Sequence, residues 1–196
     1  MYKKQLTAQK IICLAAVIVS AAVFVYSLGL VTDLYDTLYS TMRNASDLTK
    51  TDVSGSIVYY NIQDFNRQFM YASIGLLLLS VLLMITNTHT RRKYYIGNYV
   101  AVGLYSVASL VLIVWAHIQI EVYKAEFLEV DFEALKEHAE TWGTAYTEST
   151  FFFDIHYLIF GLLLVVVILL VGNVFWKRSL MKEEQELLTK GKEATA

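Results

Sequence analysis

The apolar residues of the chain gather in four long segments that are separated by polar stretches. A helix rises 1.5 Å per residue, so crossing a hydrocarbon core of about 30 Å takes about 20 apolar residues. The segments that reach this length occupy about residues 11–32, 69–86, 96–120 and 152–176, and none has Lys or Arg in its interior. The pattern therefore predicts four transmembrane helices. The first is too long for the apolar part of a signal peptide, and we expect it to be retained.

The polar stretch at about residues 33–68 begins with apolar residues at helical spacing, namely Leu34, Tyr35, Leu38, Tyr39 and Met42. This spacing predicts that the first helix continues several turns beyond its membrane span. Small and polar residues from 44 to 56 predict a turn. The chain is expected to be ordered again at about residues 57–65.

The second long polar stretch, at about residues 121–151, contains a further helical pattern. Apolar and small residues recur at Phe132, Leu135, Ala139 and Trp142, with charged residues between them. Asp131 is a suitable N-cap and Gly143 a suitable stop. The pattern predicts an external helix of about three turns whose apolar stripe packs on its own protein.

Composition agrees with a membrane protein and narrows its architecture. Hydrophobic residues make up 56% of the chain and charged residues 17%, against about 45–50% and about 25% in soluble domains. The chain has no proline, although average usage predicts about ten. Pro-kinked and broken helices are common in transporters, so its absence favours continuous helices. We predict an all-α integral membrane four-helix up-down bundle, with helical outer-loop extensions, as one transmembrane domain over residues 1–196.

Basic residues are concentrated on one side of the predicted helices. Eleven of the sixteen Lys and Arg residues lie before the first segment, in the short connection after the second, or after the fourth. The two long connections, together with Asp154, hold fourteen of the eighteen Asp and Glu residues. The positive-inside rule predicts cytoplasmic termini, with the tail 177–196 inside and both long connections outside. The formal net charge of −2 thus separates into an outer side near −9 and an inner side near +7.

Residue types within the segments indicate which faces meet protein. The polar residues of the third segment predict that it faces other helices, and Asn173 is expected to bond to a neighbouring helix. Residues 76–79 and 162–170 are apolar all round and are expected to face lipid. Cys13 is the only cysteine, so an internal disulfide is excluded and a packing role is expected, with acylation as the alternative.

The third and fourth segments each carry a histidine near the outer end. His117 follows Tyr95 by 22 residues, and His156 precedes Trp176 by 20 residues, so both rise roughly 30 Å from the inner surface. Glu121 lies one turn after His117 on the same helix face. The two imidazoles could ligate haem b between the helices, or with Glu121 they could hold Zn²⁺ or Cu²⁺. The alternatives are polar residues that hydrogen-bond across the bundle, which we favour, and a proton-linked role.

Function is less constrained by the sequence than fold. The chain has no phosphate-binding glycine loop, no Ser–His–Asp arrangement and no HExxH motif, so we do not expect an enzyme. We expect a non-catalytic accessory, scaffold or regulatory subunit of a larger complex in the plasma membrane. The alternatives are a redox subunit that binds haem or a metal through His117 and His156, and a homo-oligomeric cation channel lined by the polar third helix. The expected partners are anionic lipids at the cytoplasmic face and other membrane subunits or further copies of the chain, but not nucleic acid.

Overall fold

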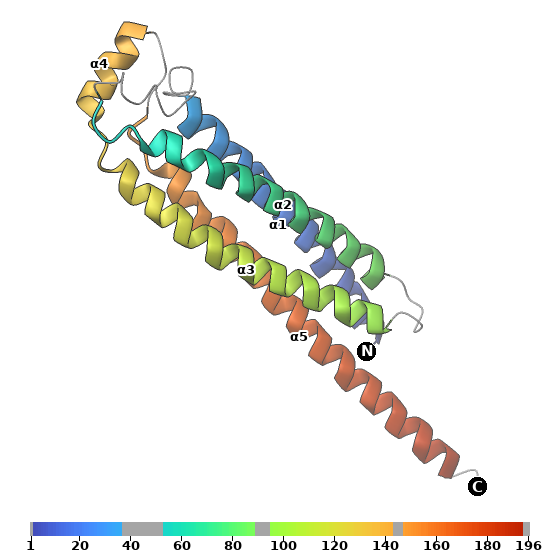
Figure 1. The fold of residues 1–196 in the computed structure, drawn as a ribbon. Helices are drawn as coiled ribbons and strands as arrows, with labels where there is room; N and C mark the ends of the chain where they lie inside the picture. Colours follow the sequence, from blue (N-terminus) through green and yellow to red (C-terminus); the bar gives the residue numbers. More distant parts are fainter. Residues whose placement is uncertain (1, 37–52, 89–94, 143–146, 194–196) are drawn as a thin grey trace. The chain divides into compact units, whose positions relative to one another are not determined.

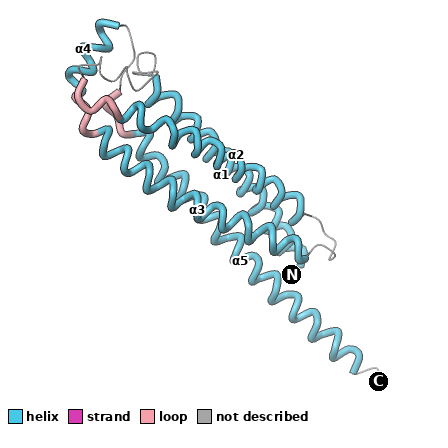
Figure 2. The backbone as a smooth tube through the Cα atoms, in the orientation of Figure 1, coloured by secondary structure: helices cyan, strands magenta, loops and turns pink. Residues whose placement is uncertain are grey.

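The computed structural model describes residues 2–36, 53–88, 95–142 and 147–193. These residues form helices joined by turns and loops, with no strand among them (Figure 2). The helices follow one another along the chain as α1 (Tyr2–Asp36), α2 (Val58–Thr88), α3 (Tyr95–Phe127), α4 (Phe132–Trp142) and α5 (Phe151–Glu193) (Figure 1). The all-α prediction is confirmed.

Four of these helices, α1, α2, α3 and α5, are long and apolar enough to span a membrane. Each predicted segment lies within one of them, and each helix extends beyond its segment. Every one of the four also exposes large apolar side chains. Those that are more than 60% exposed include Ile11, Ile18, Val25, Tyr71, Leu78, Val107, Val111, Leu158 and Ile168.

The described chain divides into two compact units, and all four long helices contribute a segment to each of them. Unit 1 comprises residues 1–20, 76–109 and 162–196, and unit 2 comprises residues 21–75 and 110–161. The cores of the two units are built from different side chains.

The core of unit 1 contains a network of buried amide and hydroxyl groups. Gln5 Nε2 donates to Gln9 Oε1 at 2.9 Å and to Asn173 Oδ1 at 3.1 Å, and Gln9 in turn donates to Asn87. These bonds join α1, α2 and α5 and confirm the expected interhelical bond of Asn173. Hydrogen bonds of this kind hold membrane helices in register, each contributing about 0.6 kcal/mol on average.

A second polar contact in unit 1 joins α1 to α3. The hydroxyl groups of Ser20 and Tyr105 lie 2.9 Å apart, and both residues are fully buried. Ser109 is buried as well and donates to the Tyr105 carbonyl at 2.8 Å. The prediction that the polar face of the third segment meets protein is therefore confirmed.

Aromatic rings fill the core of unit 2. Tyr26, Phe69 and Phe160, from α1, α2 and α5, form a triangle of edge-to-face contacts with ring centroids 5.9–6.4 Å apart. Trp115 of α3 adds its ring at 5.4 Å from Phe65. Pairs of this geometry contribute about 0.5–1.5 kcal/mol beyond the area they bury. Unit 2 is thus held mainly by packing between rings.

The described parts of the two long connections contact one another in unit 2. The turn at residues 53–57 places Gly55 at a positive φ of 77°, which glycine adopts without steric cost. A Cβ at this position would lie 2.7 Å from the backbone oxygen of Glu129. Asp131 N donates to Ser54 O at 3.0 Å. We call residues 53–57 and 128–142 the outer cap.

Helix α4 belongs to this cap and begins directly after Asp131, as predicted. The Asp131 carboxylate accepts a hydrogen bond from Ala134 N at 3.1 Å, which is the expected N-cap geometry. Leu135 and Ala139 are buried, and the ring of Phe132 lies 5.2 Å from that of Phe127. The prediction that this stripe packs on its own protein is confirmed for these residues. Gly143 and the predicted α1 extension at Leu38, Tyr39 and Met42 lie outside the described residues.

One expectation about the apolar runs was wrong. Residues 76–79 and 162–170 do not face outward all round, because each run has one buried face. Leu76 and Leu163 are buried, while Leu78 and Leu162 are exposed. A helix that packs in a bundle turns one stripe toward its neighbours whatever its composition, and a uniformly apolar run does not reveal which stripe that is.

Candidate metal centre

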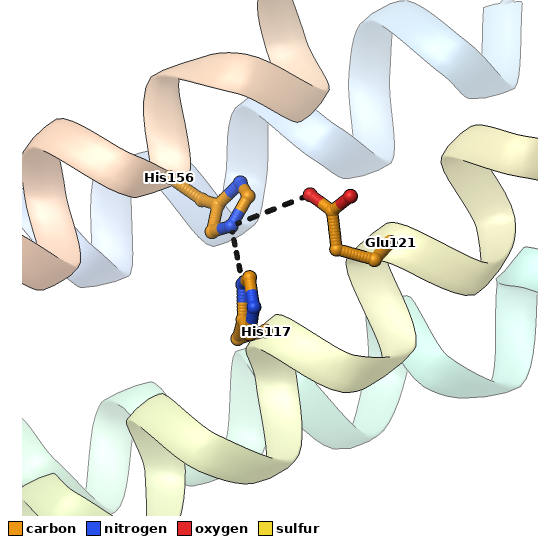
Figure 3. Close-up of side chains that lie close together, drawn as sticks. All are labelled: His117, Glu121 and His156. Carbon is orange, nitrogen blue, oxygen red and sulfur yellow. Dashed lines mark hydrogen bonds and ion pairs between the residues drawn. The ribbon is translucent and has the colours of Figure 1, made fainter.

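Three potential metal ligands converge in unit 2, between α3 and α5. His117 and Glu121 project from successive turns of α3, and His156 projects from the first turns of α5 (Figure 3). His117 Nδ1 and His156 Nε2 lie 2.8 Å apart, and His156 Nε2 lies 3.8 Å from Glu121 Oε1. The three ligand atoms are all within 4.8 Å of one another. The two histidines lie side by side, and Glu121 joins them.

The hydrogen bonds around His156 define its protonation pattern. His156 Nδ1 is bonded to the Phe153 carbonyl. A carbonyl can only accept, so Nδ1 carries the proton, and in the neutral ring Nε2 bears a lone pair. His117 Nδ1–H then donates to this lone pair. A ligating histidine in a metal site usually donates its other N–H to such a partner, so His156 is already oriented as an Nε2 ligand.

Glu121 is oriented by an aromatic neighbour that the sequence did not identify. The Tyr157 hydroxyl donates to Glu121 Oε1 at 2.8 Å, and the Tyr157 ring lies 4.1 Å from the His156 ring. Because Tyr157 holds only Oε1, the second carboxylate oxygen, Oε2, is free of this bond. The signal in the sequence is weak, because tyrosines near helix ends are common in membrane proteins.

A charged pair lies beside the ligands. Lys124 of α3 donates to Asp154 of α5, and Thr150 donates to the other oxygen of Asp154 at 2.7 Å. Asp154 therefore pairs with Lys124 and is not part of the ligand cluster. His117, Glu121 and Lys124 recur at helical spacing along one face of α3, so three contacts link this face to α5: His117–His156, Glu121–Tyr157 and Lys124–Asp154.

Burial differs sharply across the cluster. The His156 side chain is 1% exposed, whereas that of Glu121 is 38% exposed. The cluster thus has a closed side toward the unit 2 core, where Phe160 lies 5.4 Å from the His156 ring, and an open side at Glu121 and Tyr157. The remaining histidines are elsewhere: His138 lies in α4, and His89 lies outside the described residues.

The spacing of the ligand atoms is close to what one small ion requires. Two ligands that each lie about 2.05 Å from a tetrahedral ion are about 3.3 Å apart. The two histidine nitrogens, at 2.8 Å, are closer than this, and the carboxylate oxygen, at 3.8 Å from His156, is farther, so each of these two distances would change by about 0.5 Å around an ion. Axial ligands of haem lie on opposite faces of the macrocycle, about 4 Å apart with the porphyrin between them. A direct hydrogen bond between the rings leaves no such space, so the arrangement favours an ion over haem.

Comparisons with known protein families, with curated proteins and with solved structures found no match to this chain.

Proposed function

We propose that the chain is an integral membrane protein of four spans that binds a divalent transition-metal ion, of the Zn²⁺ class, through His117, Glu121 and His156. The observation that carries this proposal is the convergence of two imidazoles and a carboxylate, with His156 Nδ1 and Glu121 Oε1 each held by a further hydrogen bond. Two histidines and a glutamate form a known Zn²⁺ ligand set.

Membrane insertion is supported by the exposed apolar faces of the four long helices. Soluble monomers rarely expose contiguous apolar patches larger than a few hundred Å², and larger patches mark contact with protein or membrane. With the basic residues counted above, the positive-inside rule gives cytoplasmic termini and an outer cap that faces away from the cytoplasm. The plasma membrane is the proposed location.

The orientation is tested by labelling single cysteines with a membrane-impermeant maleimide. Glu148 and Glu186 are both exposed, one before α5 and one near its end. In a Cys13→Ala background, Glu148→Cys is expected to react in intact cells, and Glu186→Cys only after permeabilisation. The reverse pattern would overturn the proposed orientation.

Metal binding is tested on the full chain, purified in lipid nanodiscs and stripped with a chelator. Titration calorimetry with Zn²⁺ is expected to show one site per chain. Glu121→Gln keeps the size of the side chain and removes the charge of one ligand, so it should weaken binding by at least tenfold. His117→Gln removes the imidazole and should do the same. Changing an outer ligand partner usually costs 10–100-fold in affinity, and changing a ligand itself should cost no less.

His138→Ala is the matched control, because His138 lies in unit 2 but outside the cluster. Its affinity for Zn²⁺ should equal that of the unaltered chain. If the protein binds no Zn²⁺ or Cu²⁺, or if all four chains bind equally, the metal proposal fails. The histidine pair would then be a hydrogen bond between helices.

A role as a non-catalytic accessory subunit is the second candidate, and the outer cap favours it. The cap is folded and carries five exposed carboxylates, at Glu129, Asp131, Glu133, Glu137 and Glu140. A rigid acidic surface suits a basic surface on a partner. Native mass spectrometry after extraction in mild detergent should show a complex or a homo-oligomer. A monodisperse lone monomer would contradict this role without affecting the metal site.

The channel alternative receives no comparable support. Its polar residues, Tyr105, Ser106 and Ser109, are buried within the chain's own core. They are not on an outer surface where further copies of the chain would meet. We therefore do not propose that the protein conducts ions.

A further inference from the structure

We propose that the ion bound at His117, Glu121 and His156 keeps one coordination position open on the Glu121 side, and that this position takes a small monoanion from solution. The inference rests on the proposed metal site and deepens it. It adds one exchangeable ligand to the three protein ligands. Without this ligand the ion would only link α3 to α5.

The number of protein ligands leaves room for one more ligand on the ion. Within the part of the chain that the structure describes, the cluster holds three ligand residues, each offering one ligand atom. Structural Zn²⁺ sites are almost always closed by four protein ligands, whereas sites with three keep the fourth position for water or substrate. A His₂Glu set belongs to the second kind.

A further ligand could reach the ion from one side only. His156 is 1% exposed and lies against the aromatic core, so this side of the ion would be closed. Glu121 is 38% exposed and Tyr157 is 54% exposed, so a ligand can approach from their side. The free position is therefore expected on the Glu121 and Tyr157 side of the cluster.

The ion together with its three protein ligands would not be electrically neutral. A divalent ion with one carboxylate and two neutral imidazoles carries one net positive charge. Lys124 and Asp154 pair with each other and leave that charge uncompensated. An unpaired charge in a partly buried site is costly, and one monoanion would neutralise it.

Two donors lie beside the open side and suit a small anion. The Tyr157 hydroxyl already reaches Glu121 Oε1 at 2.8 Å, so it is close to the space that a bound ligand would enter. The Lys124 ammonium lies within electrostatic range of both Glu121 and Tyr157. The bound anion would displace the metal-bound water. The Lys124–Asp154 pair has no net charge, so Lys124 would act on the anion as a nearby hydrogen-bond donor.

The experiment uses Co²⁺ as a spectroscopic replacement for Zn²⁺, with azide as the anion. The full chain in nanodiscs is loaded with one equivalent of Co²⁺, whose visible absorption changes with the number and kind of its ligands. Azide should shift this absorption in a saturable way, with one azide per cobalt. Acetate should compete with azide for the same position.

A pair of lysine variants tests the assigned surroundings. Lys124→Gln should weaken azide binding by up to about fivefold, the range expected for one partly exposed charge. Lys136→Gln, on the exposed face of α4, should leave azide binding unchanged. Equal effects of both variants would show that the anion does not sit beside Lys124 and would overturn the assignment.

The experiment distinguishes a failure of the open coordination position from a failure of the metal site itself. If Co²⁺ binds but its spectrum is insensitive to azide and acetate, the open position is refuted while the metal site stands. If the resting spectrum changes with protein concentration, a side chain of a second copy fills the position, and the inference is again refuted. If Co²⁺ does not bind, the metal site itself fails and the inference fails with it.

Discussion

The two units use the same four long helices but hold them together in different ways. Unit 1 relies on directional hydrogen bonds between buried amides and hydroxyls, such as Gln5–Asn173 and Ser20–Tyr105. Unit 2 packs aromatic rings around Phe69, and its helices are also joined by hydrogen bonds such as Ser27–Ser73 and His117–His156. Hydrogen bonds fix the register of helices, whereas ring packing supplies more energy per residue. The candidate metal ligands His117, Glu121 and His156 lie in unit 2, whose core is filled by aromatic rings.

The largest test of this difference removes the central ring of unit 2. Phe69→Ala should destabilise the chain by about 3–5 kcal/mol, because it leaves a cavity among four aromatic partners. Tyr71→Ala, on the exposed face of the same helix, is the control and should cost far less. Reversible unfolding in mixed detergent measures both. Similar losses would show that ring packing does not dominate unit 2.

Metal binding should stabilise unit 2 selectively. At a Zn²⁺ concentration one hundred times the dissociation constant, linkage predicts about 2.7 kcal/mol of added stability. Hydrogen exchange should slow in residues 110–127 and 151–161, with little change in residues 2–20. His117→Gln should abolish the effect. Equal slowing throughout the chain would contradict a response confined to unit 2.

The outer cap offers a smaller and more local perturbation. Gly55→Ala should cost about 1–3 kcal/mol, because alanine is strained at positive φ and its Cβ would meet the Glu129 carbonyl. Gly103→Ala, where a Cβ has open space in the middle of α3, should be neutral or stabilising. Protease sensitivity of α4 is the measurement. If α4 is cut no faster in Gly55→Ala, the turn does not secure the cap.

The smallest expected effect belongs to the hydrogen bonds of unit 1. A double-mutant cycle with Ser20→Ala and Tyr105→Phe should give a coupling of about 0.6 kcal/mol. Pairing Tyr105→Phe with Thr7→Ala, which removes an exposed hydroxyl, should give none. A coupling above about 2 kcal/mol would mean that unit 1 is held as strongly by polar contacts as unit 2 is by rings.

Much of this organisation could be predicted from residue spacing. The helical pattern at Leu135 and Ala139, with Asp131 before it, predicted the helix α4 and the residue at which it begins, because capping and periodicity are local properties. The convergence of His117 and His156 followed from a rise of 1.5 Å per residue measured from aromatic residues near the inner ends. Glu121 followed from its spacing of four residues.

The failures concern which face of a helix is buried. Gln5 and Gln9 precede the first apolar segment, so they read as residues outside the membrane span, yet both are buried. Their burial depends on partners in α2 and α5 that are distant in the sequence. The same limit applies to Tyr157 and Lys124, whose contacts depend on how α3 and α5 are rotated. Where polar and apolar residues do not alternate with the helical period, a single sequence says little about how a helix is rotated about its axis.

The hydrogen bond from His156 to the Phe153 carbonyl has a consequence for how an ion would be captured. This ring has its proton on Nδ1 and its lone pair on Nε2 before any ion arrives, so it needs neither a flip nor a proton shift. His117, in contrast, donates from the very nitrogen that would ligate, and must relocate that proton to its other nitrogen. The His156 ring would bind the ion in its present tautomer, whereas the His117 ring would change tautomer. On metal loading, the ¹⁵N chemical shifts should report this change at His117, while Nδ1 of His156 should stay protonated.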